Sequence, residues 1–197
     1  MQVSGNLKKK KENQKSKMTK REIQISKEKR ELKLNFWQKT THYGIVIGIL
    51  IIPITIIFLS VKDVLNGTKR DFSENQLWFI IIPILISILF YFSQKRRLKF
   101  KVIYTSLNVF EIKKIITEIE EQRKWIKNKN TENYYTATTY PGFFSGSWGE
   151  LITIIFAENR IYFNSICNPN AKSSVVSMGR NKKHYLTLLN RINQASH

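Results

Sequence analysis

The sequence has few of the residues that catalytic and metal sites require. Its 197 residues include one cysteine, Cys167, and three histidines, His42, His184 and His197. A single cysteine cannot form an internal disulfide or a thiolate metal cluster, and no His, Asp or Glu spacing matches a zinc or two-metal site. The glycines of segment 141–149 lack the Gly-Lys-Ser/Thr sequence of a phosphate-binding loop. We therefore expect no enzymatic activity, no metal and no cofactor.

Acidic residues are also scarce. The chain has 14 Asp and Glu against 33 Lys and Arg, which gives a formal net charge of +19. Such a balance favours an anionic partner, either a membrane surface or a nucleic acid. We expect a membrane surface, because the chain also contains two long uncharged segments.

These two segments, residues 40–61 and 75–94, are 22 and 20 residues long and contain no formal charge. A helix rises about 1.5 Å per residue, so each can cross the ~30 Å hydrocarbon core of a bilayer. A core helix of a soluble domain carries a polar stripe, which neither segment has. The sequence therefore predicts a transmembrane hairpin over residues 36–98, with helices at about 40–62 and 75–94.

The charges beside the hairpin predict its orientation. Residues 1–42 carry 13 Lys and Arg against four acids, the loop 62–76 carries three of each sign, and the stretch Lys95–Lys101 contains five basic residues and no acid. Basic flanks stay on the cytoplasmic side of a membrane. We expect a multi-pass protein of the inner (cytoplasmic) membrane with both termini in the cytoplasm. Anionic lipids of that leaflet should lie near Lys8–Lys11 and Lys95–Lys101.

Two weaker patterns lie before the hairpin and in its first helix. Residues 1–35 are rich in polar and basic residues and are predicted to form a disordered basic arm. The alternative for residues 21–35, which mix Lys and Glu with a few apolar residues, is a helix that leads into the membrane. Gly44 and Gly48 have the Gly-x-x-x-Gly spacing that lets two membrane helices approach closely. A homo-oligomer or a different protein partner is therefore left open.

From residue 99 the pattern becomes that of a folded domain. A helix capped by Asn108 is predicted from Val109 to about Lys127–Asn130, and a last helix is predicted after its cap, Asn181. Segments with alternating or β-branched residues predict strands at 100–105, 134–140, 150–157 and 160–167. We expect a small α+β domain over residues 99–197, in the order β-α-β-β-β-α, with the helices on one face of an antiparallel sheet.

Two clusters in this domain are candidate sites. The first is the loop 141–149, where Phe143, Phe144 and Trp148 lie between glycines. On a domain held close to a bilayer, these rings can insert into the interface or grip a partner peptide. The alternative is that they fold under their own sheet.

The second cluster is Arg180, Lys182 and Lys183 at the start of the last helix, where amide donors and the helix dipole favour an anion. The alternative is an ordinary helix cap with solvated lysines. The segment Ser177–Lys183 resembles the Gly-x-Ser-Lys-Lys start of the final helix in double-stranded RNA-binding domains, which implies binding to duplex RNA. The chain lacks the Gly-Pro-x-His loop and the Ala-rich helix of that family, so nucleic acid is not the expected partner.

The whole pattern, which resembles that of small bacterial membrane proteins, predicts a non-enzymatic protein whose cytoplasmic domain serves as an adaptor or assembly module at the membrane surface. Two alternatives stay open. The C-terminal domain can be a sensor or effector that binds an anionic ligand, such as a lipid headgroup, a nucleotide or RNA. The hairpin, which contains Pro53 and Pro83, can oligomerise into a pore.

Overall fold

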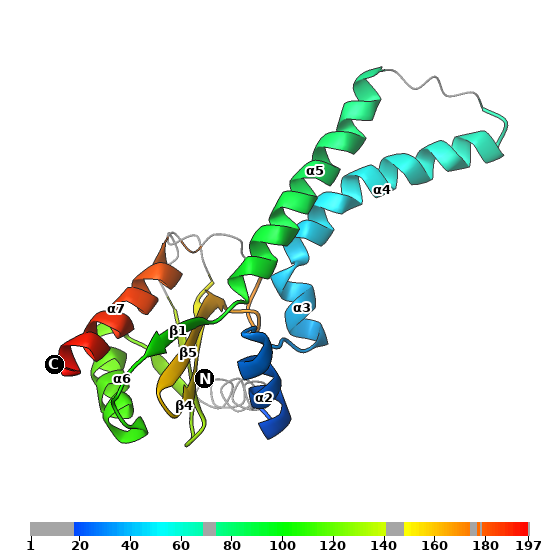
Figure 1. The fold of residues 1–197 in the computed structure, drawn as a ribbon. Coiled ribbons are helices and arrows are strands. Elements are labelled where there is room, and N and C mark those ends of the chain that lie inside the picture. The colour runs from blue at the N-terminus through cyan, green and yellow to red at the C-terminus, as the bar shows by residue number, and fades with distance from the viewer. Residues whose placement is uncertain (1–17, 69–73, 141–147, 174–176, 178, 197) are drawn as a thin grey trace, which may run out of the picture.

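A helical hairpin projects from an α+β unit in the computed structural model of the chain (Figure 1). The structure describes residues 18–68, 74–140, 148–173, 177 and 179–196. In chain order the elements are α2 (Lys20–Lys29), α3 (Phe36–His42), α4 (Gly44–Leu65), α5 (Glu74–Arg97), β1 (Lys101–Tyr104), α6 (Val109–Arg123), β2 (Ile126–Asn130), β3 (Tyr134–Thr139), β4 (Glu150–Ala157), β5 (Arg160–Cys167) and α7 (Arg180–Ala195).

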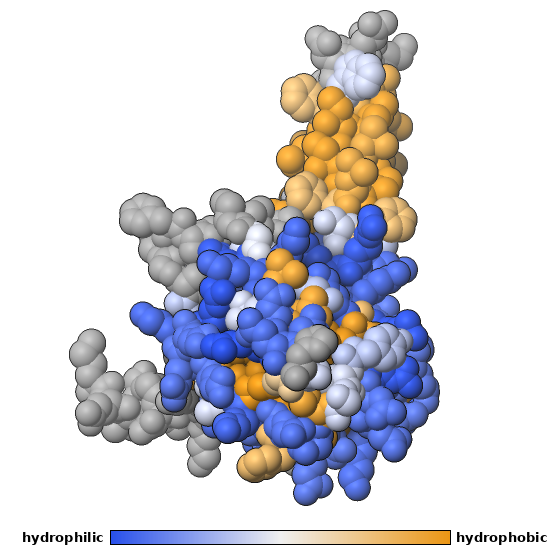
Figure 2. Space-filling model, turned by 60° about the vertical axis from the view of Figure 1, so that its left-hand side comes forward, coloured by the Kyte–Doolittle hydropathy of each residue, from blue (hydrophilic) through white to orange (hydrophobic). Residues whose placement is uncertain are grey.

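Helices α4 and α5 form the hairpin, which confirms the prediction of two long apolar helices. Both are long and apolar enough to cross a membrane, and only 17% and 11% of the residues in their apolar windows are buried. A core helix of a soluble domain would be mostly buried. Figure 2 shows apolar side chains gathered along the hairpin above a largely hydrophilic body. The bounds differ from those predicted, since α4 begins only at Gly44 and α5 continues to Arg97.

Gly44 begins α4 where the chain passes close to a later segment. A Cβ atom at Gly44 would lie 3.0 Å from Ser173 Oγ, whereas a Cβ at Gly48 would meet nothing within 4 Å. The first glycine of the Gly-x-x-x-Gly pair therefore makes room for the segment after β5. The two glycines do not form one open face for a second helix.

The sheet is antiparallel, with strand order β1-β5-β4-β3-β2. Strands β1, β3, β4 and β5 match the four predicted strands, and β4 and β5 are joined by the tight turn Glu158–Asn159. The predicted order β-α-β-β-β-α is wrong by one strand, because β2 adds a fourth strand between α6 and α7. Helix α6 ends at Arg123, since Lys124 adopts the left-handed conformation with φ 53°. Ile126 thus lies in β2 and not on the helix.

One face of the sheet is covered by α6 and α7. Their apolar positions form a core with inward residues of the strands, and Ile112, Ile119, Leu188 and Ile192 are fully buried there. The helical periodicity predicted for both elements is therefore present in the packing. Burial of these side chains removes apolar surface from water and positions α7 across the sheet.

The other face is covered by α2 and by the chain segments on either side of the hairpin. Ile23, Leu32 and Leu34 pack there with Leu98 and residues of β4 and β5. The prediction that helices cover only one face is therefore wrong. So is the prediction of disorder for residues 18–35, where a few well-spaced apolar residues suffice because the sheet supplies their partners. The rest of the predicted arm, with Lys8–Lys11, lies outside the described residues.

Candidate functional site

Reciprocal hydrogen bonds join the two helices at the base of the hairpin. His42 Nε2 lies 3.1 Å from the carbonyl oxygen of Gln94, and Gln94 Nε2 donates to the carbonyl of His42 at 2.9 Å. Both side chains are buried. Burial lowers the pKa of the His42 imidazole, so the neutral ring with its proton on Nε2 is the donor. The pair fixes the end of α3 against α5.

The end of α5 is also fixed to the sheet. Asn164 of β5 donates from Nδ2 to the carbonyls of Arg97 at 2.9 Å and Lys99 at 3.1 Å. The segment 98–100 between α5 and β1 is also bonded to the chain that precedes the hairpin. Leu32 N donates to the Leu98 carbonyl at 2.8 Å, next to an isolated bridge between residues 31 and 99. The junction between α5 and β1 is therefore held from both sides.

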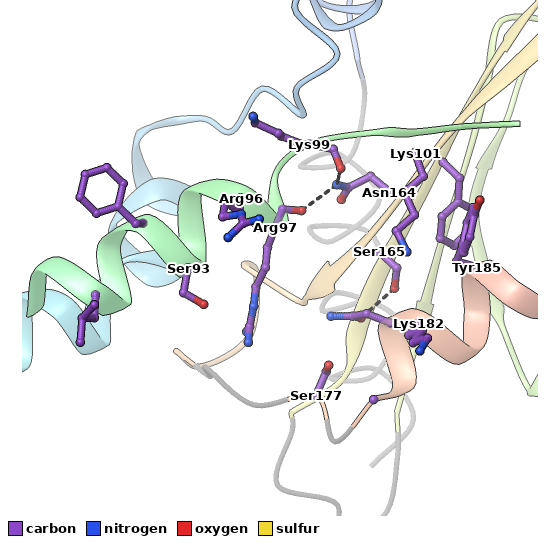
Figure 3. Close-up of a pocket in the computed structure, with 15 residues that line it drawn as sticks. Ser93, Arg96, Arg97, Lys99, Lys101, Asn164, Ser165, Ser177, Lys182 and Tyr185 are labelled. Atoms are coloured by element: carbon purple, nitrogen blue, oxygen red, sulfur yellow. Dashed lines mark hydrogen bonds between the residues drawn. The ribbon is translucent and has the colours of Figure 1, made fainter. Parts of the chain in front are cut away.

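A groove of about 660 Å³ lies between the end of α5 and the start of α7. Its floor is formed by β1 and β5. Figure 3 shows Arg97 extending from the end of α5 toward Ser177, with Lys101, Ser165 and Tyr185 on the opposite wall. Four elements from two regions of the sequence, α5 with β1 and β5 with α7, thus form one concave surface.

Five cationic side chains line this groove, and no acidic side chain is among its lining residues in the described part of the chain. Lys101 Nζ lies 4.0 Å from the ring centroid of Tyr185, a cation–π contact that holds the ammonium on the wall. Burial and the nearby charge of Lys182 both lower the pKa of Lys101. The five are Arg96, Arg97, Lys99, Lys101 and Lys182.

The start of α7 opens toward this groove. Its N-cap is Gly179, in the left-handed conformation with φ 77°, and it supplies no capping side chain. Asn181, which was expected to be the cap, is the second residue of the helix and accepts a hydrogen bond from Ser165 Oγ at 2.8 Å. The first turn of α7 therefore has no side-chain cap, and its first amide, that of Arg180, donates to the Ser177 carbonyl at 2.9 Å.

The three basic residues predicted as an anion site, Arg180, Lys182 and Lys183, lie in three different environments. Lys182 lines the groove. Lys183 is exposed beside it and is not a lining residue. Arg180 instead forms an ion pair with Glu150, with Nε and Oε1 2.6 Å apart.

Glu150 is the centre of a closed polar cluster. It is 0% exposed, accepts a hydrogen bond from Thr139 Oγ1 and pairs with Arg180. His184 Nε2 lies 3.9 Å from Oε2, while its Nδ1 accepts a hydrogen bond from Trp125 Nε1 at 3.1 Å. Burial raises the pKa of Glu150, but hydrogen bonds from these partners and the Arg180 charge outweigh burial and lower the pKa to about 2. The cluster therefore fixes the first turn of α7 to the sheet.

The predicted aromatic contact loop is described only in part. Trp148 is exposed, and Lys172 Nζ lies 4.5 Å from its ring centroid. Phe143 and Phe144 lie outside the described residues. Trp148 is therefore partly exposed, and its charged neighbour comes from the segment after β5.

The described residues hold no group of three or more His, Cys, Asp or Glu side chains that could bind a metal ion. Cys167 is a free, buried thiol at the end of β5. The groove is thus the described site with the clearest ligand chemistry, which is that of an anion.

The basic stretch Lys95–Lys101 and the basic start of α7 were predicted from the sequence, but their position opposite each other in the groove was not. Asn164 and Ser165 were not predicted as site residues. Their signal is a polar pair inside the otherwise apolar strand β5, at a position where a buried strand normally carries apolar residues. No family model, curated protein or solved structure matches this chain.

Proposed function

We propose that this chain is an integral protein of the bacterial inner membrane, with α4 and α5 as its two spans and both termini in the cytoplasm. Its α+β domain then acts as a non-enzymatic adaptor or assembly module at the membrane surface. The observation that carries the proposal is the packing of segments from both sides of the hairpin into one folded unit, with Ile23 and Leu32 from before it and Leu98 from after it.

This packing supports the topology independently of charge. Because α2 precedes the hairpin and the sheet follows it, both ends of a membrane-spanning hairpin have to lie on the same side of the bilayer. The basic flanks and the neutral loop favour the cytoplasm as that side. The hydrogen bonds of His42, Gln94 and Asn164 support a fixed distance between the domain and the bilayer.

Cysteine labelling tests the topology. Cys167 is the only cysteine and is buried, so the wild-type chain is the unlabelled control. We expect a membrane-impermeant maleimide to label Thr68→Cys in intact spheroplasts and to label Glu158→Cys only after lysis, because these exposed positions lie at opposite ends of the molecule. Labelling of Glu158→Cys before lysis, or release of the protein by alkaline carbonate, would refute the proposal.

A second candidate function, a sensor or effector of an anionic ligand, is favoured by the five cations that line the groove with no acidic lining residue in the described part of the chain. Crosslinking of the full chain in cells distinguishes the adaptor role from the sensor role. A discrete protein adduct supports the adaptor role. Anion binding that is lost in Lys182→Gln and kept in Lys183→Gln, without a protein adduct, supports the sensor role.

A further inference from the structure

We propose that the groove between α5 and α7 binds the anionic headgroup of a phospholipid from the same bilayer. The phosphate lies among the five cations, and the acyl chains follow α5 into the membrane. This inference rests on the membrane position proposed above and names the class of ligand for the second candidate function.

The wall that α5 contributes changes from apolar to cationic along its length. Leu89 and Phe92, which are 71% and 56% exposed, line the groove together with Arg96 and Arg97. The nine residues from Leu89 to Arg97 span about 12 Å of helix. A free phosphate would use only the cationic part, whereas a phospholipid has an apolar and an anionic part in the same order.

No acidic side chain of the described residues lines the groove. Lys101 and Lys182 come from β1 and α7 and lie close enough for the charge of Lys182 to lower the pKa of Lys101. An anion placed between them converts this repulsion into attraction to both. The start of α7, which includes Lys182, adds the positive end of the helix dipole at this wall.

Asn164 holds the backbone beside the groove in place. It is 3% exposed, and its Nδ2 donates to the carbonyls of Arg97 and Lys99, so the end of α5 and the start of β1 keep their positions. The Asn164 side chain alternates along β5 with Phe163 and Ser165, which face α7, and therefore lies on the other face of the sheet. The cations of α5 and β1 are thus fixed around the place that an anionic headgroup, such as that of phosphatidylglycerol, would take.

Lipid binding by the purified full chain tests the proposal. The protein is held in phosphatidylcholine nanodiscs and titrated with phosphatidylglycerol, and bound lipid is counted by native mass spectrometry. We expect preference for phosphatidylglycerol over phosphatidylcholine, and about a tenfold or greater loss of that affinity in Lys101→Gln/Lys182→Gln. Lys114→Gln/Lys183→Gln removes the same charge outside the groove and should stay within about twofold of wild type.

Soluble ligands form the other arm of the test. Glycerol 3-phosphate and ATP should bind at least about tenfold more weakly than phosphatidylglycerol, because they leave the apolar wall unfilled. Equal loss of lipid binding in both double variants would overturn the groove as the site. Soluble phosphates binding in the groove without the lipid would overturn the lipid class and leave the anion sensor standing. No binding of any of the three would overturn both.

Discussion

Two polar clusters flank the first turn of α7, and they differ in how their charges are balanced. Arg180 and Lys182 are two residues apart, so their side chains leave the helix about 200° apart. Arg180 enters the closed cluster around Glu150, where each charge has a partner. Lys182 enters the open groove, where five cations share the walls without an acid in the described part of the chain. Compensated charge stabilises the fold, whereas cations gathered in a cavity call for a ligand.

Removing the carboxylate of the closed cluster should give the largest effect. Glu150→Ala leaves Arg180 beside an apolar sheet without its counter-charge, and we expect a loss of about 3–5 kcal/mol in the free energy of unfolding. Denaturant unfolding of the full chain in detergent micelles, followed by tryptophan fluorescence, measures it. Glu158→Ala, in the exposed β4–β5 turn, is the control and should change stability by less than about 0.5 kcal/mol. Equal effects of the two variants would contradict the assignment of Glu150 as the stabilising centre.

Acid should remove the same contribution in the wild-type chain. The pKa of Glu150 is about 2 in the fold against an ordinary value of 4.5. Its stabilisation, about 3 kcal/mol, is therefore complete above pH 4.5 and is lost as the pH falls from 4.5 toward 2. Glu150→Gln lacks this titration, so the stability difference between wild type and this variant should shrink over that range. A difference that stays constant with pH would show that the carboxylate is not held charged by its partners.

A smaller pH effect on stability is expected from His42, which forms reciprocal hydrogen bonds with Gln94 at the base of the hairpin. Burial lowers the pKa of His42 below its ordinary 6.5, so the fold favours the neutral ring. Its stabilisation is complete above pH 6.5 and is lost as the pH falls below that value. His42→Asn cannot titrate, and its stability should vary less than that of the wild type between pH 7.5 and 5.5. The same slope in both proteins would mean that another group is responsible.

The open groove should give the smallest change in stability. Without anionic lipid, Lys101→Gln/Lys182→Gln should alter the free energy of unfolding by less than about 0.5 kcal/mol, because the relief of repulsion between the two lysines and the loss of the Lys101–Tyr185 contact oppose each other. The unfolding assay used for Glu150→Ala measures it in neutral detergent. Destabilisation comparable to that of Glu150→Ala would show that these cations serve the fold, and the contrast between the two clusters would disappear.

Patterns carried by neighbouring residues were sufficient for much of the fold. The apolar stretches predicted α4 and α5, and the strands β4 and β5 were predicted at the residues where they occur, because alternation and β-branching are local. Helix α2 was predicted only as an alternative to disorder, because its stability comes from Ile23 packing on strands more than 100 residues later. Strand β2 was missed because Lys127–Asn130 is a polar edge strand without apolar alternation.

The site was predictable only as separate pieces. Arg180 and Lys182 look equivalent along the chain, and only the position of Glu150 on β4 separates a structural arginine from a groove lysine. The meeting of α5 and α7 is likewise a result of strand order, since β1 lies beside β5 in the sheet. No local pattern records that pairing.

The contact between Met18 and Tyr134 has a consequence for how the protein is made. The Met18 amide donates to the Tyr134 hydroxyl at 3.2 Å, across 116 residues of chain. A ribosome that adds about 5–20 residues per second needs about 6–23 s to synthesise that stretch. During this delay both spans are synthesised, while Ile23, Leu32 and Leu34 still have no partner strands. Insertion of the hairpin therefore has time to precede closure of the domain, and the early segment has to be kept from aggregation until β4 and β5 arrive.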